Sequence, residues 1–149
     1  MKEEVMFDRL FLDTSSLVKL YINELDSEII IHSFRQYPKR ILSELAKIEF
    51  KSAIYKKYRY KLISLEKALE IIWSFENDYI LFEWITINQT IISRVSALLD
   101  KYGSYNLRTL DAIQLASAIA VKSPETKFLC SDKVLNELFD LENLEPALL

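Results

Sequence analysis

Short apolar runs alternate along this chain with longer segments in which polar and apolar residues are mixed. Three of the runs are brief and almost wholly apolar, and a fourth alternates between apolar and polar positions, as strands do. Continuous apolar runs are typical of strands that are covered on both faces. The predicted strands are 9–13 (RLFLD), 40–42 (RIL), 81–87 (LFEWITI) and 126–130 (TKFLC).

The longer segments have the length and mixed composition of amphipathic helices. Several begin at residues whose side chains can cap a helix, namely Thr14 or Ser15, Ser43, Ser64 and Thr109. The predicted helices are 14–25, 26–37, 44–61, 64–79, 88–103, 107–121 and 131–141.

Strands that alternate with helices are joined by right-handed crossovers into a mostly parallel sheet with helices on both faces. The order of elements therefore predicts the α/β class. The chain has one glycine, three prolines, and no low-complexity linker or repeat. We expect residues 1–149 to form a single domain.

The composition excludes several kinds of site and points to carboxylates. The sequence is 50% hydrophobic and 28% charged, and it shows neither a signal peptide nor a membrane span. This favours a cytoplasmic protein with no membrane partner. Cys130 is the only cysteine, expected to be a small core residue, and His32 is the only histidine, expected to be an ordinary surface or core residue. A disulfide, a multi-thiolate metal site and serine–histidine catalysis are therefore not expected.

The net charge of −3 argues against a protein that coats nucleic acid without specificity. It does not exclude a nuclease, because an acidic metal site lowers the net charge while a basic patch elsewhere binds phosphate.

Three acidic residues fall where ligands bind in open α/β sheets, beyond the carboxyl ends of the strands. Asp13 and Asp132 each follow a predicted strand and precede a helix, and Asp111 lies in the first turn of another helix. Each of them can also be a simple helix cap, because helix N-termini stabilise negative charge.

Glu49 lies in the middle of a predicted helix and cannot be a cap. Its neighbours on the helix surface are small or apolar, which allows a facing element to approach closely; they are Leu45, Ala46, Ser52 and Ala53. The alternative is an exposed glutamate at the edge of the apolar face. If Glu49 faces inward, its carboxylate needs a cation or a proton, and several carboxylates together suit Mg²⁺.

Four segments, FLDTSSLVKLY, SELAKIEFKSAIYK, LRTLDAIQLASA and FLCSDKVL, occur in the order and at roughly the spacing seen in PIN domains. The chain resembles the PIN-domain toxins of the VapC type over nearly all of its 149 residues. The resemblance implies a three-layer PIN-like fold and an endoribonuclease dependent on Mg²⁺ or Mn²⁺.

The same resemblance assigns roles to individual residues. Asp13, Glu49, Asp111 and Asp132 match the family's catalytic and metal-binding acids. Thr14 or Ser15, and Ser131, match the hydroxyl residues beside those acids.

Two positions depart from the family pattern. The tail LENLEPALL lacks the glycine expected after the last helix, which leaves its edge strand uncertain. Gln114 replaces a histidine found in many relatives, and we expect this change to matter little.

Residues 51–61 (KSAIYKKYRYK) are a candidate RNA-binding segment. Lysines and an arginine are interleaved with tyrosines, so basic groups can follow phosphates while aromatic rings stack on unpaired bases. The candidate RNA-binding residues are Lys51, Lys56, Lys57 and Arg59. The alternative is a solvated helix end whose tyrosines pack inward.

The segment EIIIHSF contains three consecutive isoleucines, which cover more of a helix than one buried face needs. Part of this surface is expected to meet a second chain, and a deeper core is the alternative. The family resemblance implies a cognate antitoxin as one partner and a homodimer as another.

Two other functional classes share features with this sequence. Aspartyl-nucleophile phosphatases also begin with a strand that ends in aspartate, but they require a second aspartate two positions later, where this chain has Ser15. The remaining alternative is a non-catalytic PIN-like module that binds RNA or protein.

Overall fold

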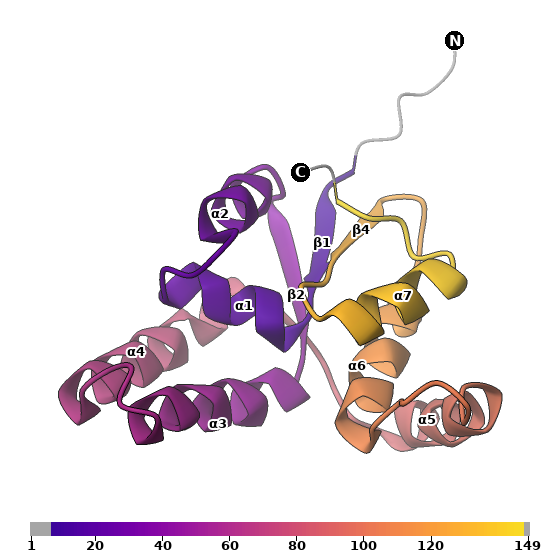
Figure 1. Ribbon diagram of the computed structural model, residues 1–149. Helices are drawn as coiled ribbons and strands as arrows, with labels where there is room; N and C mark the ends of the chain where they lie inside the picture. The colour runs from indigo at the N-terminus through magenta and orange to yellow at the C-terminus, as the bar shows by residue number, and fades with distance from the viewer. Residues whose placement is uncertain (1–6, 148–149) are drawn as a thin grey trace, which may run out of the picture.

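A computed structural model of the chain, described here for residues 7–147, contains a parallel sheet of four strands in the order β3-β2-β1-β4 (Figure 1). The strands are β1 Arg9–Leu12, β2 Lys39–Ser43, β3 Glu83–Ile85 and β4 Thr126–Leu129. All four predicted strands are therefore present, and the predicted α/β class is confirmed.

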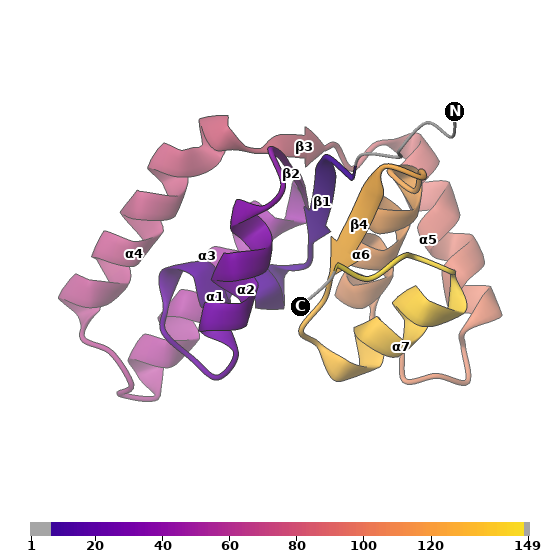
Figure 2. The ribbon, with the colours of Figure 1, turned by 90° about the horizontal axis from the view of Figure 1, so that it is seen from above.

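Helices cover both faces of the sheet, which gives three layers (Figures 1 and 2). The first group consists of α1 Thr14–Tyr21, α2 Ser27–Arg35, α3 Leu45–Arg59 and α4 Leu65–Asn77. The second group consists of α5 Gln89–Lys101, α6 Thr109–Ala120 and α7 Lys133–Leu141. A short 3-10 helix, Asp78–Leu81, joins α4 to β3.

Each face of the sheet has its own hydrophobic core, because side chains alternate along a strand. Leu10 and Leu12 of β1 pack with the first group of helices, while Phe11 between them packs with the second group. All three side chains are fully buried. On the first face, the rings of Phe50 in α3 and Phe75 in α4 lie 4.3 Å apart and join these two helices.

Of the four predicted caps, one was right and two were wrong; the fourth, Ser43, lies one residue before the cap position of α3, where its hydroxyl accepts the N–H of Leu45. Asp13, not Thr14 or Ser15, caps α1, and its side chain accepts the backbone N–H of Ser16. Thr109 is the first residue of α6 and follows Arg108, which makes no side-chain cap. Ser64 caps α4 as predicted, accepting the N–H of Lys67.

Helix α1 is shorter than predicted and ends at Tyr21 instead of Leu25. The Ser27 hydroxyl accepts the N–H of Glu24 and donates to the carbonyl of Ile22, so the backbone groups after the helix bond to a side chain instead. Asp26 then adopts a left-handed conformation, with φ of 70°, before α2 begins.

The tail does pair with the sheet edge despite its missing glycine. Asn143 takes the left-handed conformation after α7, with φ of 56°, which asparagine adopts more easily than most residues. Leu144 donates to the carbonyl of Phe139, closing the helix end. The tail then forms a parallel bridge between Pro146 and Phe128.

The single cysteine and the single histidine of the sequence lie in different environments. Cys130 is half-buried against the second core, and His32 is exposed and bonded to the side chain of Gln36. Within residues 7–147 no helix is both long and apolar enough to cross a membrane.

The isoleucine run of α2 is divided between core and surface. Ile30 is 4% exposed and belongs to the first core, Ile31 is half-buried, and Ile29 is 44% exposed.

This division gives a matched pair of adjacent variants. Ile30→Ala should lower the free energy of unfolding by about 2–4 kcal/mol, because it leaves a cavity in the core. Ile29→Ala should change it by no more than about 0.5 kcal/mol, as is usual at exposed positions. Urea unfolding followed by circular dichroism measures both, and equal effects would contradict this placement of α2.

Candidate active site

Asp13 lies where β1 ends, beside the end of the neighbouring strand β4 (Figure 1). Its carboxylate is 2% exposed and is held by three donors. Oδ1 accepts the backbone N–H of Ser16 at 3.0 Å and that of Ser131 at 3.3 Å, and Oδ2 accepts the Ser15 hydroxyl. Burial and these bonds fix the position of the carboxylate.

Two serines connect the same strand ends. The hydroxyls of Ser16 and Ser131 lie 2.7 Å apart, and the Ser16 hydroxyl also donates to the carbonyl of Leu129. Ser16 was not among the predicted site residues. The sequence signal for it was the pair of adjacent serines after Asp13, of which only Ser15 was selected.

Glu49 points toward the sheet from α3 and is not an exposed edge residue. Its Oε1 atom accepts the Thr14 hydroxyl at 2.9 Å and the Gln114 side-chain amide at 2.8 Å. Both of these donors bind the same oxygen, so Oε2 is the atom that Glu49 can offer to another ligand. Thr14 therefore lies beside one of the predicted site acids.

Gln114 has a larger part in this site than the sequence analysis expected. It is 2% exposed, and its Nε2 atom donates to Thr14 at 2.9 Å as well as to Glu49. Its own Oε1 atom is buried, and no donor reaches it from the described residues. An unsatisfied buried acceptor costs about 1–3 kcal/mol. Gln114 therefore favours the orientation of Glu49 at the expense of stability.

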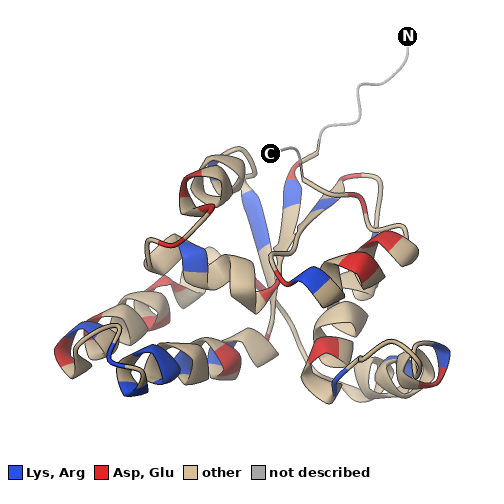
Figure 3. Cartoon of the chain, in the orientation of Figure 1, with Lys and Arg blue, Asp and Glu red and all other residues tan. Residues whose placement is uncertain are grey.

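Asp111 and Asp132 occupy the helix starts that the sequence predicted. Asp111 lies in the first turn of α6 and is half-buried. Asp132 caps α7, where Oδ1 accepts the N–H of Leu135 at 2.8 Å, and it is exposed. Acidic segments are visible in Figure 3 where α1 and α7 begin.

The charges of the four acids act on one another, which indicates that they lie near one another. Burial raises the pKa of Glu49, and the charges of Asp111 and Asp13 raise it further, against hydrogen bonds from Gln114 and Thr14 that lower it. Burial also raises the pKa of Asp111, together with the charges of Asp132 and Asp13, while Arg108 lowers it. Each acid thus interacts electrostatically with at least one of the others.

Cys130 lies close to these acids but is not a nucleophile. Burial raises the pKa of its thiol, and the negative charge of Asp13 raises it further. The thiol therefore stays protonated at neutral pH, whereas a nucleophilic cysteine needs its thiolate.

The donor set fits a hard divalent cation. Carboxylate oxygens are the ligands that Mg²⁺ and Mn²⁺ prefer, and a cation would relieve the repulsion that raises the two pKa values. Within residues 7–147, no three of these groups already stand in a geometry that would hold a metal ion. The Asp13 and Glu49 oxygens instead accept hydrogen bonds from Ser15, Thr14 and Gln114, so a cation would compete with these bonds.

No protein-family model matches the sequence, and no curated protein matches it either. Several solved structures are similar to this chain. One is the Mycobacterium tuberculosis toxin VapC20, which cleaves the sarcin–ricin loop; it is 12% identical, with a TM-score of 0.66 over 87% of this chain and 94% of that one. Another is a toxin–antitoxin complex from Klebsiella pneumoniae, at 20% identity and a TM-score of 0.55 over 80% of this chain and 82% of that one.

The chain has the fold of the VapC toxins. At these identities the likeness establishes the fold alone, so the chemistry of the site must be argued from the residues of this chain.

On this VapC fold the candidate RNA-binding residues do not form one patch. Lys56 and Lys57 line a pocket that also includes Ser15 and Ser131, beside the acidic site. Lys51 and Arg59 line a different hollow, on another face of α3. The tyrosines are not packed inward as a group, since Tyr58 is 39% and Tyr60 67% exposed. Figure 3 shows the basic segments gathered at the end of α3.

The raised pKa values make stability depend on pH in a defined direction. A carboxyl group with a raised folded pKa binds more protons in the folded than in the unfolded state, so the free energy of unfolding falls as pH rises. For Glu49 and Asp111 this fall begins near pH 4, where unfolded carboxyl groups titrate, and is complete above the folded pKa values.

Asp111→Asn should therefore stabilise the metal-free protein at pH 7. Asparagine keeps an oxygen for the Arg108 N–H but carries no charge, and the gain should be a few tenths to about 1 kcal/mol because Asp111 is half-exposed. Thermal unfolding in EDTA between pH 4 and pH 8 measures it, with exposed Asp100→Asn as the matched control. If the variant is less stable than the wild type at pH 7, Asp111 is not repelled by the other acids and only stabilises the start of α6.

Proposed function

We propose that this protein is an endoribonuclease dependent on Mg²⁺ or Mn²⁺ and the toxin of a type II toxin–antitoxin pair. The proposal is supported by the placement of Asp13, Glu49, Asp111 and Asp132 near the strand ends of a VapC fold, where their charges act on one another. The solved toxin VapC20 acts on an RNA loop, which supports RNA as the substrate class.

The four acids of this chain would bind the metal ion in different ways. Asp13 would be the best-positioned ligand, because burial and the backbone N–H groups of Ser16 and Ser131 hold its carboxylate. Glu49 would present Oε2, since Thr14 and Gln114 occupy Oε1. Asp111 and Asp132 would complete the set from two helix starts. A cation bound there would activate a water molecule and stabilise charge on the phosphodiester oxygens.

The hydroxyls beside the acids have a separate role. The Ser15 hydroxyl bonds to Asp13, and Ser131 bonds to Ser16 at the mouth of the neighbouring pocket. Neutral donors at this place can bind phosphate oxygens without adding to the acidic charge.

A protein partner is supported by the surface of α4 more than by α2. Leu65, Leu69 and Trp73 are spaced one turn apart and are 44%, 48% and 67% exposed, and Ile80 and Leu81 beyond them are 89% and 63% exposed. Apolar stripes of this kind are typical of protein–protein interfaces. A similar fold has been solved as a toxin–antitoxin complex. We propose an antitoxin and a second copy of the chain as the partners.

The chemistry is tested with single-stranded RNA and purified protein. The wild type should cleave RNA in the presence of Mg²⁺ or Mn²⁺, and EDTA should abolish this cleavage. Asp13→Asn should lose about 100-fold or more in rate, the scale of removing one preorganised charged group. Asparagine can still cap α1, so the fold should survive.

Asp140→Asn, an exposed change at the far end of α7, is the matched control and should cleave like the wild type. RNA binding without cleavage in every metal, by a folded wild type, would favour the non-catalytic module instead. Equal rates for Asp13→Asn and the wild type would remove Asp13 from the mechanism.

A further inference from the structure

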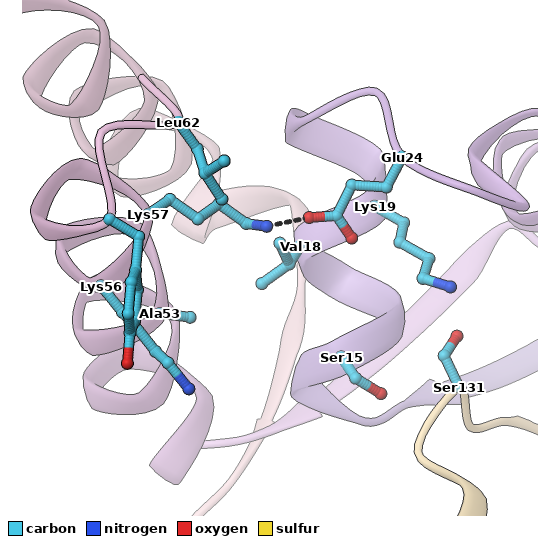
Figure 4. A pocket seen from close by; sticks show the side chains of 10 residues that line it. Ser15, Val18, Lys19, Glu24, Ala53, Lys56, Lys57, Leu62 and Ser131 are labelled. Carbon is cyan, nitrogen blue, oxygen red and sulfur yellow. Dashed lines mark ion pairs between the residues drawn. The ribbon is translucent and has the colours of Figure 1, made fainter. Parts of the chain in front are cut away.

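A pocket of about 340 Å³ lies next to the acidic site, between α1 and the C-terminal half of α3 (Figure 4). Ser15 and Ser131 border it on the side of the acids. The side chains farther from the acids come from α1, α3 and the segments that follow them. Its volume is at the lower end of the roughly 300–1,000 Å³ found for small-ligand sites.

The walls of the pocket combine an apolar surface with a positive charge. Val18, Ala53 and Leu62 supply the apolar part. Three lysines line the pocket against one acid, Glu24, whose carboxylate forms an ion pair with Lys57. Lys19 and Lys56 are left to carry the charge, and Figure 4 shows them on opposite sides, from α1 and α3. A ligand that fits here has an apolar part and a negative charge.

Tyr60 gives the pocket an aromatic surface at its outer end. It follows directly after α3 and is 67% exposed, and the ammonium group of Lys56 lies 5.8 Å from the centre of its ring. Exposed aromatic rings beside cations are the usual means by which proteins hold unpaired bases, with the ring against the base and the cation against the phosphate.

We propose that this pocket binds one unpaired nucleotide of the RNA, adjacent to the bond that is cut. The base stacks on Tyr60 above the apolar floor, and Lys56 and Lys19 bind the flanking phosphates. Ser15 links the two places, since it lines the pocket and its hydroxyl bonds to Asp13. The strand therefore passes from the pocket directly onto the acids.

This inference rests on the proposed ribonuclease function, and it adds a requirement for single-stranded RNA at a defined distance from the cut. Excess positive charge and continuity with the acidic site favour a nucleotide over an apolar peptide segment as the occupant.

The test measures binding in EDTA, so that it does not depend on cleavage. Fluorescence anisotropy with a labelled ten-nucleotide single-stranded RNA should show that Tyr60→Ala weakens binding by about fivefold to 100-fold, the range for losing one stacked base. Tyr60→Phe keeps the ring and should bind like the wild type. Tyr58→Ala is the matched control, because Tyr58, in the last turn of α3, is also exposed but does not line the pocket.

A second variant separates charge from stacking. Lys56→Ala should bind more weakly and should reduce the slope of log affinity against log salt by about 0.7, the value for one phosphate contact on a single strand. A lysine that only supports the fold would leave this slope unchanged.

A series of RNAs, each lacking the base at a different position, identifies the nucleotide that occupies the pocket. At one position next to the mapped cut, removing the base should weaken RNA binding by the wild type as much as Tyr60→Ala does. The same abasic RNA should bind to the Tyr60→Ala variant no more weakly than the intact RNA does. If the wild type cleaves RNA but Tyr60→Ala binds RNA as tightly as the wild type does, the nucleotide pocket is wrong. The proposed ribonuclease function would still stand. Tyr60-dependent binding without any cleavage would support the pocket and contradict the proposed function.

Discussion

The parallel pairing of β1 with β4 is the constraint on which the site depends. It joins residues more than 110 positions apart, and the backbone N–H of Asp13 continues it by donating to the carbonyl of Leu129. Beyond that bond both strands turn into helices, so Asp13 and Ser131 meet where backbone N–H groups are free. Asp13 accepts two of these N–H groups, which holds a buried charge that would otherwise be costly.

The same region contains features that lower the stability of the fold. Burial and like charges raise the pKa values of Glu49 and Asp111, and a buried oxygen of Gln114 goes without a donor among the described residues. An apolar residue at position 114 would remove that unsatisfied acceptor but would also release Glu49. The two large cores on either side of the sheet supply the stability that allows this arrangement.

The sequence predicted the features that depend on local patterns. Four strands, seven helices and the helix-start positions of Asp13, Asp111 and Asp132 follow from periodicity and from the rule that ligands bind beyond strand ends. The roles of Gln114 and Ser16 did not follow, because they depend on contacts between elements 65 to 115 positions apart. The tail bridge was uncertain for a local reason, since Asn143 supplies a conformation that was expected only of glycine.

Helix α3 connects the acids to the proposed nucleotide pocket as a rigid spacer. Glu49 lies in its first half and Lys56 seven residues later, a separation of about 10 Å along the axis at about 1.5 Å per residue. Phe50 packs on Phe75 and Tyr21, so the middle of the helix is anchored on both sides. A base held at the end of α3 is thus kept at a fixed distance from the carboxylates. If the pocket selects the nucleotide, this spacing, and not a contact to the reacting phosphate, determines which bond of the strand is placed at the acids.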